Sequence, residues 1–226
     1  MTLMMPYTFE IEPSRAALLI VDMQYATGSR TEGLGVLLAN AGQLEERKHY
    51  FDRIEQIVLP RQQELIAYFR EHKLPVLYVQ SGSELSDCAD APPHRIDRYR
   101  MRHQYPGHRE YDILDKIKPL PSDYVVNKTT VSAFASSGLE SLLRALNVES
   151  LLVCGILTDV CVGLTARNAA DRGFKTLLVE DCCAADDETH HRVEIATFGR
   201  LFGRAETVAN VKEEMDRRYR EAEKRL

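Results

Sequence analysis

The chain has 226 residues, of which 44% are hydrophobic, so it can bury a sizeable core in one large α/β domain or two small ones. Its net charge is −5, and acidic and basic residues are mixed along the chain, which argues against a surface for nucleic acid. The longest uninterrupted apolar run, residues 16–21, is far shorter than the roughly 20 residues that span a bilayer. We therefore expect neither nucleic acid nor a membrane as a partner.

The N-terminal segment MTLMMPYTFEIEPSR contains two glutamates and lacks the basic start and apolar stretch of a secretory signal. We expect it to be a surface arm over residues 1–15, and we expect the protein to be cytoplasmic. The five cysteines form no CxxC pair, so reduced thiols are expected. Cys154, Cys182 and Cys183 lie in or at the end of apolar runs, where a cysteine is usually a small buried hydrophobe.

Short apolar runs alternate with helical patterns along the chain. This alternation is typical of a parallel sheet that is covered by helices on both faces, a three-layer α/β/α fold. Several runs are apolar throughout, as strands buried on both faces are. The six predicted strands cover residues 17–22, 76–80, 124–127, 151–155, 176–180 and 206–208.

Between these runs, residues 45–72 have apolar side chains at helical spacing, with a break or kink predicted near Pro60. Gly173 is placed to cap the helix that precedes it. No repeat or linker is evident, so we predict a single domain over residues 1–226 that ends in a helix over residues 211–226. The other predicted helices cover residues 138–147, 160–172 and 188–201.

Residues 81–122 interrupt this alternation, with five prolines and little periodicity. A long irregular segment in a compact domain is usually functional or part of an interface. Its arginines could bind an anionic group or a neighbouring subunit, and a solvated arginine-rich loop is an equal alternative. These arginines are Arg95, Arg98, Arg100, Arg102 and Arg109. The histidines among them, His94, His103 and His108, are interpreted as surface residues because they lack metal-ligand spacing.

Three polar residues follow apolar runs at the carboxyl ends of predicted strands, where ligands of open parallel sheets bind. They are Asp22, Lys128 and Cys161. Taken singly, each could be a turn cap, a surface charge or a packing residue. Together they are the acid, cation and thiol that thiol-based catalysis needs.

The thiol is expected to lie in the first turn of a helix, because Thr158 or Asp159 is a good N-cap. The positive end of the helix and a nearby Lys128 ammonium would favour a thiolate. Cys161 is therefore the predicted nucleophile, and its amide would point towards a substrate oxyanion.

The sequence resembles the isochorismatase-like hydrolases, specifically their cysteine amidohydrolase branch. The resemblance covers nearly the whole chain in order. It implies a Rossmann-like six-stranded fold. The segments that carry it are ALLIVDMQ (17–24), VVNKTTVSAF (125–134), CGILTDVCVGLTARNAADRGF (154–174) and LVEDCCAADDETH (178–190).

The resemblance also implies a catalytic triad of Asp22, Lys128 and Cys161 and a cis peptide bond between Ile156 and Leu157. The N–H groups of Leu157 and Cys161 would form an oxyanion hole. The implied reaction cleaves a carbon–nitrogen bond of a small amide or ureide through a covalent thioester or thiocarbamate on Cys161. Neither a metal nor another cofactor is required, and a homodimer or homotetramer is expected.

Within this branch the sequence is most similar to hydrolases of ureidoacrylate, biuret and N-carbamoyl compounds. THHRVEIATFGRLFGRAETV near the C-terminus adds to the likeness to the ureidoacrylate group. Candidate substrate contacts are Gln24, Tyr25, Phe134 and part of the loop 81–110, with core packing as the alternative for Tyr25 and Phe134.

Other classes of function remain open at this point. Isochorismatase-type chemistry is disfavoured by Cys161, and the nicotinamidase type by the lack of an Asp-x-His metal pair. A thiol redox protein would need a resolving cysteine, for which Cys182 and Cys183 are the candidates. A non-catalytic protein that binds a small molecule is a further alternative, although no GxGxxG motif follows a strand.

Overall fold

The computed structural model describes residues 7–224, and it contains the expected six-stranded sheet. All strand pairs are parallel, and the order is β3-β2-β1-β4-β5-β6. The predicted α/β fold is thus confirmed. The strands are β1 (Ala16–Val21), β2 (Val76–Ser81), β3 (Tyr124–Lys128), β4 (Ser150–Ile156), β5 (Lys175–Ala184) and β6 (Arg204–Glu206).

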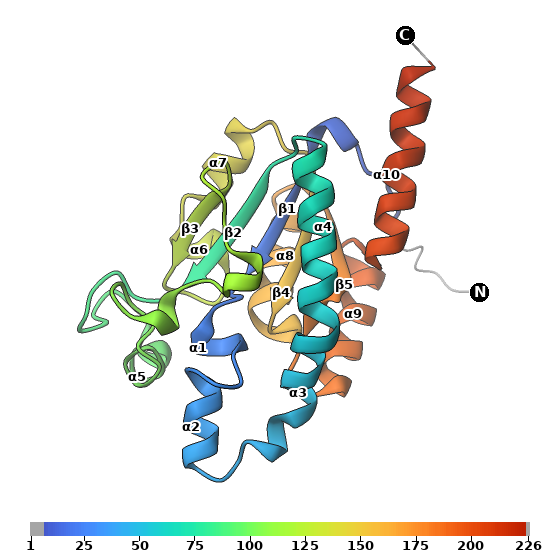
Figure 1. Ribbon diagram of the computed structural model, residues 1–226. Helices are drawn as coiled ribbons and strands as arrows, with labels where there is room; N and C mark the ends of the chain where they lie inside the picture. Colours follow the sequence, from blue (N-terminus) through green and yellow to red (C-terminus); the bar gives the residue numbers. More distant parts are fainter. Residues whose placement is uncertain (1–6, 225–226) are drawn as a thin grey trace.

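The helices form the two outer layers (Figure 1). α4 crosses the front face of the sheet with α10 beside it, whereas α7 and α8 lie behind the sheet. α1, α2 and α3 gather at the carboxyl ends of the strands, the edge that carries the site. The helices are α1 (Tyr25–Gly28), α2 (Leu34–Asn40), α3 (Lys48–Arg53), α4 (Leu59–Glu71), α5 (Pro93–Met101), α6 (Ala133–Ser136), α7 (Leu139–Ala145), α8 (Gly163–Asp171), α9 (Glu188–Leu201) and α10 (Val208–Glu223).

The central strands β1 and β4 are buried at every residue, because helices cover both faces of the sheet. Cys154, Cys182 and Cys183 are fully buried in this core, as their apolar surroundings predicted. All five cysteines are free thiols. Burial of these uniformly apolar strands fixes the sheet, and the sheet fixes the positions at which its carboxyl ends emerge.

The sequence predicts a break or kink of the helix near Pro60, whereas the structure has a continuous helical segment there. The chain continues from α3 into α4 through a π-helical turn, Ile54–Val58, whose wider ring is closed by the bond from the Leu59 N–H to the Ile54 carbonyl. Pro60 lies in the first turn of α4. A proline is tolerated there because the first N–H groups of an α-helix have no acceptor within the helix, so its missing N–H costs little.

The segment 81–122 is more ordered than its prolines suggest. It contains α5, which begins at Pro93, and two single turns of 3₁₀-helix, Arg109–Tyr111 and Asp115–Ile117. A proline at the start of a helix favours it, because its fixed φ suits the first turn. The proline at 93 is thus a start signal for a helix, which the prediction of irregular structure missed.

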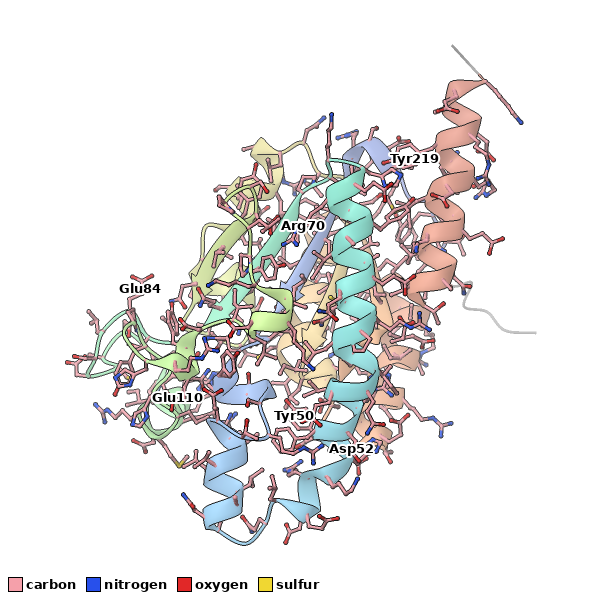
Figure 2. All side chains as sticks on the ribbon, in the orientation of Figure 1. Tyr50, Asp52, Arg70, Glu84, Glu110 and Tyr219 are labelled. Carbon is pink, nitrogen blue, oxygen red and sulfur yellow. The ribbon has the colours of Figure 1, made fainter. Side chains whose placement is uncertain are left out.

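Near the C-terminus, the predicted strand 206–208 is displaced. β6 ends at Glu206, and Thr207 caps α10 by accepting a hydrogen bond from the Asn210 N–H. Tyr219 of α10 stacks on His72 at the end of α4, with ring centroids 5.0 Å apart (Figure 2). α10 therefore packs on the domain. Residues 225–226 of the predicted helix and 1–6 of the predicted arm lie outside the described residues. Among residues 7–224, none of the helices combines the length and apolar character needed to cross a membrane.

Candidate active site

The structure brings Asp22, Lys128 and Cys161 together at the carboxyl edge of the sheet. Asp22 follows β1, Lys128 is the last residue of β3, and Cys161 lies in the helical turn Thr158–Val162 after β4. Lys128 Nζ lies 2.9 Å from Asp22 Oδ2 and 3.5 Å from Cys161 Sγ. One ammonium therefore contacts both the carboxylate and the sulfur.

Asp22 has a positive φ of 56°, which an aspartate adopts more readily than most residues. Its N–H donates to the Val79 carbonyl of β2 at 2.9 Å, and its own carbonyl accepts from Thr27 Oγ1 at 2.8 Å. Its Oδ1 is buried without a hydrogen-bond partner among the described residues. This oxygen is therefore free to accept a proton.

Burial of the Cys161 thiol raises its pKa, and the Asp22 carboxylate raises it further, whereas Lys128 and Arg95 act in the opposite direction. The raised pKa differs from the expectation that helix and ammonium would favour a resting thiolate. Desolvation outweighs these favourable charges, so the thiol is protonated at neutral pH. Burial by itself would lower the pKa of Lys128, but Asp22 and Cys161 raise it overall, so the ammonium remains charged.

The turn that carries Cys161 is built differently from the prediction. Its N-cap is Leu157, and neither Thr158 nor Asp159 caps it. The Thr158 hydroxyl instead lies 2.9 Å from His191 Nδ1 of α9. The peptide bond between Ile156 and Leu157 is cis.

A cavity of about 320 Å³ opens beside the sulfur. Arg95 lines it and is only 5% exposed, and its Nη2 lies 3.6 Å from Cys161 Sγ. Sequence reasoning placed Arg95 in an irregular loop and did not assign it to the sulfur. Tyr50 of α3 (labelled in Figure 2) was also missed. The lining residues include Asp22, Tyr50, Arg95, Arg98, Arg102 and Cys161.

Of the substrate-contact candidates, part of the loop 81–110 lines this cavity, whereas Gln24, Tyr25 and Phe134 do not. The Gln24 side chain is buried and bonds the backbone of Ser81 on both sides, accepting from its N–H at 2.7 Å and donating to its carbonyl at 3.3 Å. Tyr25 lies under Arg109, 3.8 Å from its guanidinium carbon, and Phe134 packs against Phe174. Substrate contacts by Gln24, Tyr25 and Phe134 therefore remain predictions from the sequence, because proximity to Asp22 or Lys128 in sequence does not determine which way a side chain points.

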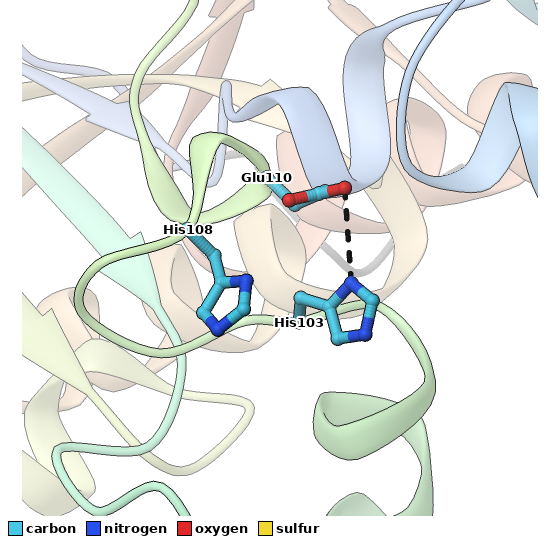
Figure 3. Close-up of side chains that lie close together, drawn as sticks. All are labelled: His103, His108 and Glu110. Atoms are coloured by element: carbon cyan, nitrogen blue, oxygen red, sulfur yellow. Dashed lines mark ion pairs between the residues drawn. The ribbon is translucent and has the colours of Figure 1, made fainter.

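Two clusters in the described part of the chain have the ligand types that could hold a metal ion. One is formed by His103, His108 and Glu110, which follow α5 (Figure 3). His103 and His108 stack with ring centroids 4.9 Å apart, and His103 Nδ1 lies 3.8 Å from Glu110. The other cluster comprises Asp159, Asp186 and His190. Neither cluster includes a residue of the Asp22–Lys128–Cys161 group.

The chain is similar to proteins of a known family. Residues 16–210 match the model of the isochorismatase domain. The ureidoacrylate amidohydrolase RutB of Methylobacterium radiotolerans is 26% identical over 219 residues, which cover 90% of this chain and 81% of that protein. The RutB of Rhizobium rhizogenes is 28% identical over 204 residues, covering 82% of this chain and 74% of that protein.

Solved structures agree on the fold. A cysteine hydrolase from Pseudomonas syringae pv. phaseolicola superposes with a TM-score of 0.80 at 23% identity, covering 96% of this chain and all (100%) of that one. The N-carbamoylsarcosine amidase of Thermoplasma acidophilum has a TM-score of 0.63 at 25% identity, with 86% and 96% of the chains covered. The chain belongs to the isochorismatase family.

Proposed function

We propose that the protein hydrolyses a carbon–nitrogen bond of a small amide or ureide, with Cys161 as nucleophile. The observation that carries this proposal is the position of Lys128 Nζ, in contact with both Asp22 and Cys161 Sγ. In this buried site the carboxylate can take the thiol proton and the ammonium can stabilise the thiolate that results. The thiolate therefore forms during the reaction, and the resting thiol stays protonated. The names of the RutB relatives and of the N-carbamoylsarcosine amidase support the same type of bond.

In the proposed first half-reaction, the Cys161 thiol gives its proton to Asp22 as the sulfur attacks the substrate carbonyl carbon. Lys128 stabilises the negative charge on sulfur as the proton leaves. The carbonyl π electrons move to oxygen, and the N–H groups of Leu157 and Cys161 are assigned to hold this oxyanion. When the oxyanion collapses, the carbon–nitrogen bond breaks, and Asp22 returns its proton to the departing nitrogen.

The second half-reaction hydrolyses the thioester or thiocarbamate left on Cys161. Asp22 takes a proton from water, and the resulting hydroxide attacks the acyl carbon. Collapse of this second tetrahedral intermediate breaks the carbon–sulfur bond, and the proton on Asp22 returns to sulfur. The net reaction consumes one water and releases ammonia or an amine together with the acid.

The size of the cavity supports a small substrate, because about 320 Å³ is at the lower end of ligand sites. Ureidoacrylate, biuret and N-carbamoyl compounds are the substrate types that fit this proposal. The assembly into a homodimer or homotetramer and the cytoplasmic location remain predictions from the sequence.

The test is an assay of ammonia release with a panel of ureides, N-carbamoyl amino acids, maleamate and nicotinamide. We expect turnover of at least one ureide or N-carbamoyl compound, and we expect Cys161→Ala to lose at least about 10³-fold in kcat. Cys182→Ala and Cys183→Ala are the matched controls and should stay active. Activity that survives in Cys161→Ala would refute the proposal, and dependence on a second cysteine would indicate thiol redox chemistry instead.

A further inference from the structure

One wall of the cavity is formed by arginines of α5. Arg95, Arg98 and Arg102 all line the cavity, and their spacing of three and four residues places them on one face of this helical segment. The other arginines of the segment lie elsewhere. Arg100 donates to the Asp87 carbonyl at 2.6 Å, and Arg109 pairs with Asp115 at 2.6 Å.

Four arginines line the cavity, and Arg47 pairs with Asp186, whereas Arg95, Arg98 and Arg102 have no acidic partner among the described residues. In residues 7–224, no carboxylate oxygen lies within ion-pair distance of their guanidinium groups, and the Nε atoms of Arg95 and Arg102 are buried without a hydrogen bond. The two acids that line the cavity are already engaged. Asp186 pairs with Arg47 at 2.7 Å, and Asp22 pairs with Lys128 at 2.9 Å.

Clustering unpaired guanidinium groups is unfavourable where water is excluded: Arg95 is buried and Arg102 is half-buried, whereas Arg98 is exposed. Burial, the largest cause, and the charges of Arg98 and Arg95 together lower the pKa of Arg102 to about 10. Buried charges are normally paired or hydrogen-bonded, because desolvation without compensation is costly. An anionic ligand would supply the missing partners, and the arginine fork suits the carboxylate group in particular.

The cluster indicates more than one negative charge on that ligand. Arg95 lies against the Cys161 sulfur at 3.6 Å, which leaves Arg98 and Arg102 for the distal part of the ligand. Four residues of helix separate Arg98 from Arg102, a rise of about 6 Å. Charges spread along a wall match two separated carboxylates better than a single compact anion such as phosphate.

We propose that the cavity takes an amide or ureide that bears two carboxylates, bound by Arg98 and Arg102, while Arg95 lies beside the reacting sulfur. This inference rests on the proposed function for the identity of the scissile bond. The carboxylates themselves need only bind, so their recognition can be measured without turnover.

The experiment uses Cys161→Ala protein, in which the nucleophile is absent, and measures binding by calorimetry. Two isosteric pairs are compared: N-carbamoylaspartate with N-carbamoylasparagine, and N-carbamoylglutamate with N-carbamoylglutamine. In each pair a neutral amide replaces one carboxylate. We expect the dicarboxylate of at least one pair to bind about tenfold or more tightly than its amide partner, because a hydrogen-bonded ion pair is lost.

Arginine variants then assign this preference to residues. Arg98→Gln and Arg102→Gln, each added to Cys161→Ala, should remove most of the preference. Arg100→Gln is the matched control, since it removes the same charge from the same helix outside the cavity, and it should retain the preference. Equal affinity within both pairs would overturn the proposal, as would a preference that survives in both Arg98→Gln and Arg102→Gln. Equal affinity within both pairs would favour a neighbouring subunit as the source of the missing acids. The proposed hydrolase function is tested separately, by the ammonia-release assay with Cys161 variants.

Discussion

Gly155 of β4 packs directly against the backbone of Val21 in β1. The two residues are register partners in the sheet, and a Cβ atom on Gly155 would lie 2.1 Å from the Val21 carbonyl oxygen. Gly155 also has a φ of 124°, which side chains rarely permit. Val21 immediately precedes Asp22, so this close approach sets the position at which the carboxylate leaves the sheet.

Gly155→Ala is therefore expected to lower the free energy of unfolding by about 3 kcal/mol or more, because backbone strain is added to a clash with rigid backbone. The control is Gly107→Ala, which also has a positive φ, 92°, but open space at the Cβ position. It should cost only about 1 to 2 kcal/mol. Urea unfolding of both variants measures the difference, and equal losses would contradict the role assigned to the Val21 contact.

Lys128→Met should destabilise the protein by about 3 to 5 kcal/mol, since it leaves the Asp22 carboxylate buried without its partner. The double variant Asp22→Asn with Lys128→Met removes both charges and should recover most of this loss. Both variants should be inactive in ammonia release. Recovery of activity along with stability in the double variant would show that the pair is structural only.

The alkylation of Cys161 should report its raised pKa. We expect slow labelling by iodoacetamide at neutral pH and a rate that is still increasing above about pH 9, beyond the range of an ordinary cysteine. Asp22→Asn removes a neighbouring negative charge and should shift the midpoint of the rate profile to lower pH. A midpoint below that of a free cysteine peptide in the unmodified protein would indicate a resting thiolate, contrary to this prediction.

His191 should make the protein sensitive to acid. Burial, the largest cause, and the charge of Arg53, whose Nη2 lies 2.9 Å from Nε2, together lower its pKa from 6.5 to about 4. Above pH 6.5 the residue is neutral in both the folded and unfolded states and has no effect on stability. As the pH falls towards 4, the unfolded state binds the proton more readily, so folding stability is lost.

The expected loss from His191 is about 2 to 3 kcal/mol at about pH 4.5. It is measured as the change in unfolding free energy between about pH 8 and pH 4.5 in the unmodified protein, minus the same change in His191→Gln. Taking this difference cancels the contributions of carboxylates, which both proteins share. If the two proteins lose the same stability on acidification, His191 does not titrate as described.

The sequence alone determined the sheet and the positions of the three residues predicted to react. Apolar runs such as residues 16–21 and 151–155 are typical of strands covered on both faces, and the alternation with helices predicts that they are parallel. In a parallel sheet all carboxyl ends lie on one edge, so Asp22, Lys128 and Cys161 were predictable neighbours. Their roles in catalysis remain predictions.

Only the tertiary structure decided what surrounds these residues. Side-chain direction, desolvation and long-range contact depend on how segments pack, and no local pattern encodes them. Arg95 and Cys161 are 66 residues apart and meet because α5 folds back over the sheet edge. The same packing buries the sulfur and raises its pKa, where the helix and the Lys128 ammonium had predicted a thiolate. It also turns Gln24 towards the Ser81 backbone and away from the cavity.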